Sequence, residues 1–196
     1  WNDSFYMHTN KDAEDFKIEK TKDINFKKWD TYVPAKDETL IGGLTFLKNW
    51  EIRSEVTNAL GKIFVKNLKD NKEEELIFSD EEVFDGGVSL VQKDKNTDLI
   101  HISYSTPKTQ SRVYLYNLRT KEKKLVKEQI IPSGHNSNDY VVERLECLSH
   151  DGRKVPLTIT RHKKTKIDGN ANVLLYGYGS YGNSMSPSFS STRLSL

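Results

Sequence analysis

The sequence predicts a mostly β fold, in which a partial β-propeller is followed by the first strands of a second domain. Three observations predict it: a unit of short strands recurs, helical signals are few, and the recurrence stops at a run of turn-forming residues. Hydrophobic residues make up only 35% of the 196 residues, but nine Tyr, eight Phe and three Trp supply large surfaces for modest cores between strands.

The recurring unit is clearest in two segments that share one pattern. Residues 62–69 (KIFVKNLK) recur as residues 112–119 (RVYLYNLR), so that Asn67 and Asn117 lie 50 positions apart, and a weaker copy begins at residues 15–19. Units of about 40 to 50 residues built from short strands are typical of propeller blades. We therefore expect about two and a half to three blades, with an ordinary antiparallel meander as the alternative.

The character of the chain changes at residues 131–139, where Pro, Ser, Gly, Asn and Asp gather in a predicted linker. The repeat does not resume after this run. We therefore predict two domains, a partial β-propeller over residues 1–138 and the beginning of a second domain over residues 139–196.

The second domain is predicted to open with a hairpin. Residues 141–149 and 154–160 are strand-like and flank Asp151-Gly152, a dipeptide that tolerates the backbone angles of a tight turn. Pro156 keeps its strand at a sheet edge or near a bulge. A buried strand is expected at residues 172–176, directly before a loop rich in glycine and tyrosine.

Charge and cysteine usage narrow the classes of partner. The formal net charge is only +2 and lysines alternate with acidic residues, so we expect no nucleic-acid partner and no membrane partner. Cys147 is the only cysteine, which predicts a reducing, cytoplasmic location and no cysteine-based metal site. The chain is expected to be a soluble fragment, because an apolar pattern starts at residues 193–196 as the sequence stops.

The loop at residues 176–182 (YGYGSYG) allows two interpretations from spacing alone. Gly177, Gly179 and Gly182 satisfy the G-x-G-x-x-G spacing of dinucleotide sites, but the residues that follow are poor helix formers and no acidic residue lies at the required distance. Tyr178 replaces the first glycine of a G-x-S-x-G elbow, so Ser180 is a poor candidate nucleophile. No cofactor is therefore expected.

Several motifs resemble the serine peptidases of the prolyl oligopeptidase family and, within it, the oligopeptidase B group. The main match is LLYGYGSYG at 174–182, with PSFS at 187–190 and RLSL at 193–196; ERL at 143–145, DGRKVP at 151–156 and SYSTP at 103–107 support it. The resemblance implies the last blades of a seven-bladed propeller followed by the first strands of an α/β-hydrolase domain.

The same resemblance implies roles for single residues. Tyr178 matches the tyrosine whose hydroxyl helps to form the oxyanion hole, and Tyr181 matches an aromatic position that lines the substrate cleft. Gly177 and Gly179 would permit the turn and the close approach of substrate. The serine, acid and histidine of the family's triad would all lie beyond the matched region, and none of the five histidines of this chain fits a catalytic or metal-binding pattern.

The expected function is therefore that of a piece of a serine oligopeptidase that cleaves short peptides after Lys or Arg and is inactive alone. Its partners would be short peptide substrates and the missing remainder of the enzyme. Ser186 and Ser188 stand where some relatives carry aspartates, which argues against a strong preference for paired basic residues. The alternative is a catalytically dead propeller remnant that binds peptides or proteins through its strand edges.

Overall fold

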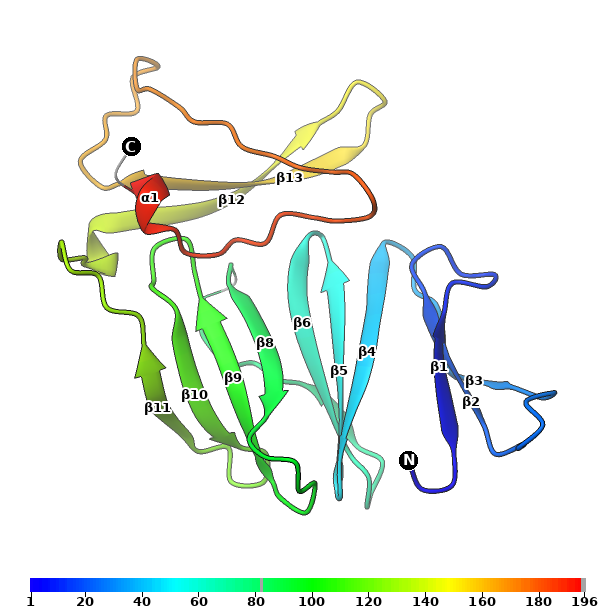
Figure 1. The fold of residues 1–196 in the computed structure, drawn as a ribbon. Coiled ribbons are helices and arrows are strands. Elements are labelled where there is room, and N and C mark those ends of the chain that lie inside the picture. Colours follow the sequence, from blue (N-terminus) through cyan, green and yellow to red (C-terminus); the bar gives the residue numbers. More distant parts are fainter. Residues whose placement is uncertain (82, 195–196) are drawn as a thin grey trace. The chain divides into compact units, whose positions relative to one another are not determined.

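The structure, a computed structural model, describes residues 1–81 and 83–194, which form four sheets (Figure 1). Neighbouring strands in each sheet follow chain order. The first sheet holds β1 (Phe5–Thr9), β2 (Lys17–Thr21) and β3 (Asp30–Val33); the second holds β4 (Thr39–Leu47), β5 (Trp50–Thr57), β6 (Leu60–Asn67) and β7 (Glu73–Glu75). The third holds β8 (Asp85–Leu90), β9 (Leu99–Ser105), β10 (Arg112–Asn117) and β11 (Lys123–Glu128).

The remaining elements follow the third sheet. A short 3-10 turn, η1 (Ser137–Asp139), leads into a hairpin of β12 (Tyr140–Leu148) and β13 (Lys154–His162), and a single helical turn, α1 (Ser191–Leu194), lies near the end of the described chain. The chain divides into two compact units, one of residues 1–78 with 90–99 and the other of residues 79–89 with 100–196.

The predicted repeat is confirmed as a repeat of sheets. Its two clearest copies are β6 and β10, the third strands of the two four-stranded sheets. Asn67 and Asn117 each end such a strand, and the side-chain Oδ1 of each accepts the backbone N–H two residues later, at 2.9 Å in both turns. Asparagine recurs there because its short amide can satisfy the backbone of the turn that leads to the fourth strand.

The sequence interpretation missed the first strand of each four-stranded sheet, β4 and β8, because each is interrupted by a pair of glycines. Gly42 and Gly43 together oppose Ser54 in a β-bulge, where the register with β5 shifts. In β8 the matching pair is Gly86 and Gly87, and the Ser103 hydroxyl donates to the Gly87 carbonyl at 3.2 Å. A glycine pair packed against a serine of the second strand is thus a further signal of the repeat.

Gly42→Ala should destabilise the protein while Gly43→Ala should not. A methyl group on Gly42 would lie 2.7 Å from the Ser54 carbonyl oxygen and closer still to its hydroxyl, whereas nothing lies within 4 Å of one on Gly43. Forcing β4 and β5 apart should lower the free energy of unfolding by about 1–3 kcal/mol. Chemical denaturation of both variants measures this, and equal stability of the two would refute the packing argument.

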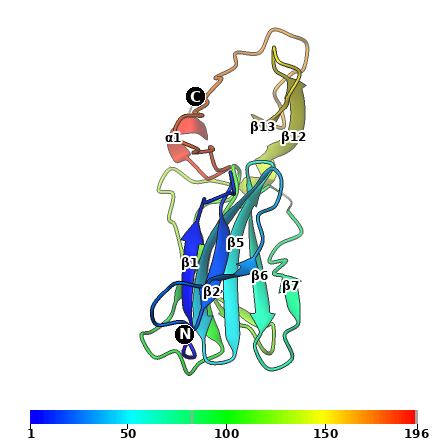
Figure 2. The ribbon, with the colours of Figure 1, turned by 90° about the vertical axis from the view of Figure 1, so that its right-hand side faces the viewer.

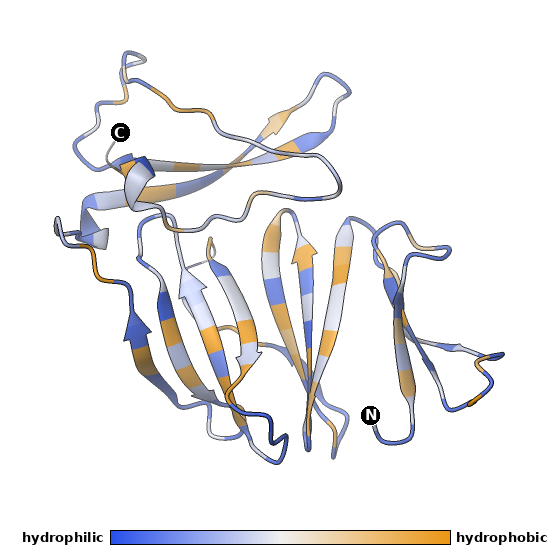
Figure 3. Ribbon diagram, viewed as in Figure 1, coloured by the Kyte–Doolittle hydropathy of each residue, from blue (hydrophilic) through white to orange (hydrophobic). Residues whose placement is uncertain are grey.

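The first unit buries an apolar core between its two sheets. Ile18 of β2, Val33 of β3 and Ile41 of β4 form this core, with exposures of 5% or less. Figure 2 shows this unit from the side of β1 and β2, with β5, β6 and β7 of the second sheet also in view. Apolar and polar residues alternate along the strands (Figure 3), because successive side chains point to opposite faces of a sheet.

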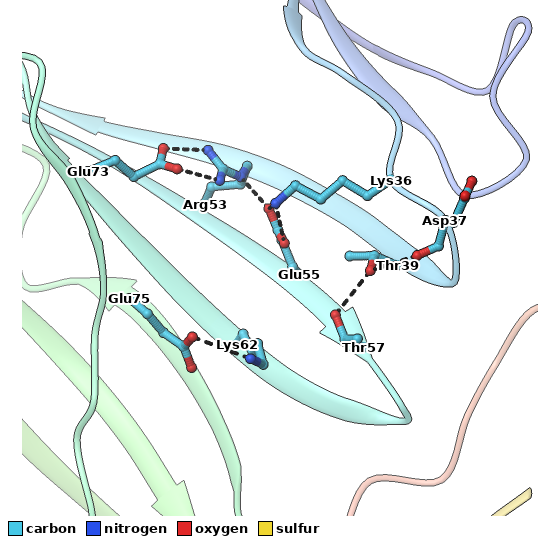
Figure 4. Close-up of polar contacts among 9 residues, drawn as sticks. All are labelled: Lys36, Asp37, Thr39, Arg53, Glu55, Thr57, Lys62, Glu73 and Glu75. Atoms are coloured by element: carbon cyan, nitrogen blue, oxygen red, sulfur yellow. Dashed lines mark hydrogen bonds and ion pairs between the residues drawn. The ribbon is translucent and has the colours of Figure 1, made fainter.

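The face of β5 that carries Glu51, Arg53 and Glu55 is buried although it is charged, with exposures of 1%, 4% and 3%. Arg53 donates to both oxygens of Glu73 at 2.7 and 2.9 Å and to Glu55 at 2.9 Å (Figure 4). Lys36 donates to both oxygens of Glu55 at 2.7 and 2.8 Å. Arg53 and Glu55 therefore each have a partner of opposite charge, as burial of ions requires.

A second part of this charged layer is centred on Tyr32 of β3. Its hydroxyl donates to Glu51, and the Lys66 ammonium donates to the same hydroxyl at 3.3 Å. Lys20 and Lys66 lie 5.2 and 5.1 Å from the centre of the Tyr32 ring. Burial and the neighbouring Glu51 carboxylate raise the pKa of Tyr32, so the phenol stays neutral and serves as a donor.

The predicted hairpin after the linker is confirmed. β12 and β13 pair from Tyr140 with His162 to Leu148 with Lys154, and Gly152 takes the left-handed backbone angle, φ +80°, in the turn. Pro156 pairs opposite Glu146 in this two-stranded ladder, so it lies on an edge strand as expected.

The prediction of a buried strand at residues 172–176 is wrong for this structure. The segment has no strand geometry, and Val173, Leu174 and Leu175 are 85%, 62% and 83% exposed. A strand in the interior of a sheet needs hydrogen-bonded neighbours, and within residues 1–81 and 83–194 no strand pairs with this segment. The apolar run therefore has the composition of a buried strand without the partners that would bury it.

Candidate active-site loop

The loop at residues 176–182 lies in the second unit, between β13 and α1. Its one tight turn comes at the end, where the Asn183 amide donates to the Ser180 carbonyl at 3.1 Å. Tyr181 and Gly182 take left-handed backbone angles there, with φ of 56° and 68°. A non-glycine residue in that region carries backbone strain.

Tyr178 and Tyr181 present their rings to solvent, with exposures of 51% and 92%. Among the described residues, the Tyr178 hydroxyl makes no hydrogen bond, so its donor is available to a ligand. Gly177 and Gly179 have open space where a side chain would lie, and neither has a positive φ. Their roles as turn formers stay a prediction, since the strained turn of this structure lies at Tyr181 and Gly182.

Two residues without an assigned role hold the C-terminal end of the segment that carries this loop. The ring of Phe189 packs edge-on against His135 at 5.0 Å between ring centres, and the Phe189 amide donates to the Ser105 hydroxyl at 3.5 Å. Phe189 belongs to the PSFS motif but carried no assigned role. His135 fits no catalytic or metal-binding pattern, and no local pattern pairs it with a residue so far along the chain.

His8 also has a packing role. The His8 ring stacks on Phe16, and its Nε2 bonds the Ile41 carbonyl at 2.7 Å. Across residues 1–81 and 83–194, no three His, Cys, Asp or Glu side chains gather in a way that could hold a metal ion. In the same part of the chain, no helix is long and apolar enough to cross a membrane.

One further polar cluster lies at β9 in the second unit. The Tyr104 hydroxyl donates to Glu81 at 3.0 Å and bonds Ser79 at 2.9 Å, and Lys108 pairs with Glu81 at 3.1 Å. Burial is the main cause that raises the pKa of Tyr104 to about 12. These contacts connect the segment before β8 to β9.

Comparison with known proteins identifies the protein family. Residues 1–129 match the family model described as "Prolyl oligopeptidase, N-terminal beta-propeller domain". The chain therefore belongs to the prolyl oligopeptidase family of serine peptidases, and its four-stranded sheets are propeller blades. This result removes the alternative of an ordinary meander and confirms the family resemblance of the motifs.

Individual relatives extend the similarity beyond the propeller. The chain is 33% identical to dipeptidyl aminopeptidase BI of Pseudoxanthomonas mexicana over 99% of this chain and 27% of that protein. It is 26% identical to protease 2 of Moraxella lacunata, over 100% of this chain and 28% of that protein. It is similar in structure to oligopeptidase B from Trypanosoma brucei with covalently bound antipain in its closed form. That similarity has a TM-score of 0.85 and 28% identity over 97% of this chain and 30% of that one. The chain thus spans little more than a quarter of the relatives' length.

Proposed function

We propose that this chain is part of a serine-type oligopeptidase that hydrolyses short peptides. Residues 1–138 would supply the last blades of a seven-bladed propeller, and residues 139–196 would begin an α/β-hydrolase domain. The observation that carries the proposal is the alignment with a peptidase over 99% of the chain, which continues through the tyrosine loop after the propeller. A propeller remnant that only binds peptides is not favoured, because such a module would not need that loop.

The exposed apolar run supports the existence of a larger catalytic domain around it. Val173 and Leu175 are more than four-fifths exposed, and they lead directly into the loop of Tyr178. Covering such side chains stabilises a protein by about 1.5–3 kcal/mol each, so the run favours a partner surface. The rest of the same enzyme is the partner we propose, and the chain alone should be inactive.

Tyr178 would act as a hydrogen-bond donor to the negatively charged oxygen that forms when a peptide carbonyl is attacked. Its available hydroxyl on a loop beyond the apolar run suits this role. The exposed ring of Tyr181 would pack against a substrate side chain, with Gly177 and Gly179 leaving room for the peptide backbone. No cofactor is needed for this chemistry.

Cleavage after Lys or Arg, in the cytoplasm, is the finer part of the proposal. It rests on the oligopeptidase B resemblance and on Cys147 as the only cysteine. Ser186 and Ser188 are neutral, so a second basic residue before the cleaved bond should add little.

A peptide panel tests this specificity in the complete protein encoded by the gene. We expect cleavage after Lys or Arg in peptides with blocked amino termini, and rates that change less than tenfold between one basic residue and two. Mass spectrometry of the products identifies the cleaved bond. Release of dipeptides only from free amino termini would instead indicate the activity in the name of the Pseudoxanthomonas relative. Absence of any cleavage would contradict the proposed function.

A further inference from the structure

Four aromatic side chains from separate parts of the second unit form one cluster, here called the aromatic clasp: His135, Tyr140, His162 and Phe189. The ring centres of His135 and Tyr140 are 5.4 Å apart, as are those of Tyr140 and His162, while His135 and Phe189 are 5.0 Å apart. The rings meet at tilted or edge-on angles of 31°, 88° and 65°, which are favourable arrangements for aromatic pairs.

The clasp is attached to the turn between β9 and β10. His135 Nε2 lies 2.6 Å from the Lys108 carbonyl oxygen. Because a carbonyl oxygen only accepts, this nitrogen must carry the proton and donate. On the Phe189 side, the backbone amide donates to the hydroxyl of Ser105, which is 5% exposed, and neighbouring Pro187 is buried. The clasp thus fixes both the linker and the final segment to the last blade of the chain.

Two members of the clasp lie at the two ends of the long loop that carries the tyrosines. His162 is the last residue of β13, and Phe189 follows the long loop that carries Tyr178 and Tyr181. Every residue from 163 to 186 is exposed, so packing along its length does not fix the loop within this unit. The two ends of the loop are instead held through Tyr140 and His135. Joining the two ends of a loop lowers the conformational entropy of the loop.

We propose that the aromatic clasp is a positioning device that holds the tyrosine loop at the end of the propeller. This inference rests on the proposed function, because the loop that it positions carries the proposed oxyanion donor. His135 and Phe189 would act through Tyr178 and would not touch substrate. A catalytic donor displaced by about 1 Å can lose on the order of 100-fold in rate, so an anchor of this kind can affect turnover from a distance.

Hydrogen exchange of the complete protein tests the clasp without any need for activity. Phe189→Ala and His135→Ala should each raise exchange at residues 105–109, 135–140 and 187–190 by at least tenfold. His150→Ala, at an exposed histidine in the hairpin turn, should leave exchange unchanged. Unchanged protection at those residues in both clasp variants would contradict the anchoring role of the clasp. A complete protein without peptidase activity would contradict the proposed function, but it would leave the exchange result valid.

Kinetics then test whether the clasp positions the loop. We expect both alanine variants to lower kcat by about 10-fold or more with KM changed less than threefold, since a displaced donor weakens the transition state more than the bound substrate. Phe189→Leu and His135→Gln, which keep apolar bulk and an N–H donor, should recover most of kcat. Faster exchange with an unchanged kcat would overturn the positioning role, as would failure of the conservative variants to recover kcat although they fold with normal exchange.

Discussion

Tyr178→Phe in the complete protein should lower kcat by on the order of 100- to 1,000-fold, the usual effect of removing one oxyanion-hole donor. The change deletes only the hydroxyl, which makes no hydrogen bond among the described residues, so the stability of the fold should not change. Because the donor meets a charged oxygen only in the transition state, KM should stay within about threefold. Steady-state kinetics on a single peptide substrate separate the two constants.

Tyr176→Phe is the matched control, because it removes a hydroxyl from the same loop at a residue 64% exposed to which no role is assigned. It should leave kcat within about twofold. Equal losses of kcat in the two variants, or a loss confined to KM for Tyr178→Phe, would contradict the oxyanion assignment.

Arg53→Met should lower the free energy of unfolding by about 2–3 kcal/mol, because it removes one of the two cationic partners of the buried Glu55 carboxylate and both hydrogen bonds to Glu73. Glu55 is 3% exposed and accepts from Arg53 at 2.9 Å, and Glu73 loses both of its bonds to the guanidinium. Lys36 stays near Glu55 and offsets part of the loss. Urea denaturation of the complete protein measures the change.

The control is Lys62→Met on the neighbouring strand. Lys62 and Glu75 form an ion pair of 3.3 Å in which both side chains are 40% exposed, so its loss should change stability by no more than about 1 kcal/mol. A similar small effect for Arg53→Met would show that the charged face of β5 contributes no more than a surface pair does.

The Arg53 pair also predicts the dependence of stability on pH. The hydrogen bonds from Arg53 are the main cause that lowers the pKa of Glu73 below its ordinary value of 4.5. A lowered carboxyl pKa stabilises the folded state fully above about pH 4.5, and this contribution is lost as the pH falls through the folded-state pKa. We therefore expect stability to fall between neutral pH and acid less steeply in Arg53→Met than in the natural protein. Parallel pH profiles would contradict this linkage.

The parts of the fold that the sequence predicted are those with local signals. Alternating apolar residues and the asparagine of the turn identify β6 and β10, and Asp151-Gly152 identifies the last hairpin. The first strands β4 and β8 escaped prediction because their glycine pairs usually mark loops, and here they allow close packing on Ser54 and Ser103.

The error at residues 172–176 has a different cause. An apolar run of this length has the composition of a buried strand, but pairing depends on neighbours that local sequence does not reveal.

The candidate site also has one part that local sequence reveals and one part that it does not. Tyr178 could be found from its motif, whereas the clasp joins His135 to Phe189 across a long stretch of chain and only the structure shows it.

Covalent labelling of the complete protein tests the central claim most directly, namely that the tyrosine loop belongs to a serine peptidase. A fluorophosphonate forms a bond from serine Oγ to phosphorus and releases fluoride, so it reacts with an activated serine and not with ordinary hydroxyls. We predict one labelled serine, in a G-x-S-x-G elbow encoded after Leu196, with labelling that abolishes peptide hydrolysis. A complete protein that has no such elbow and takes up no label would contradict the claim.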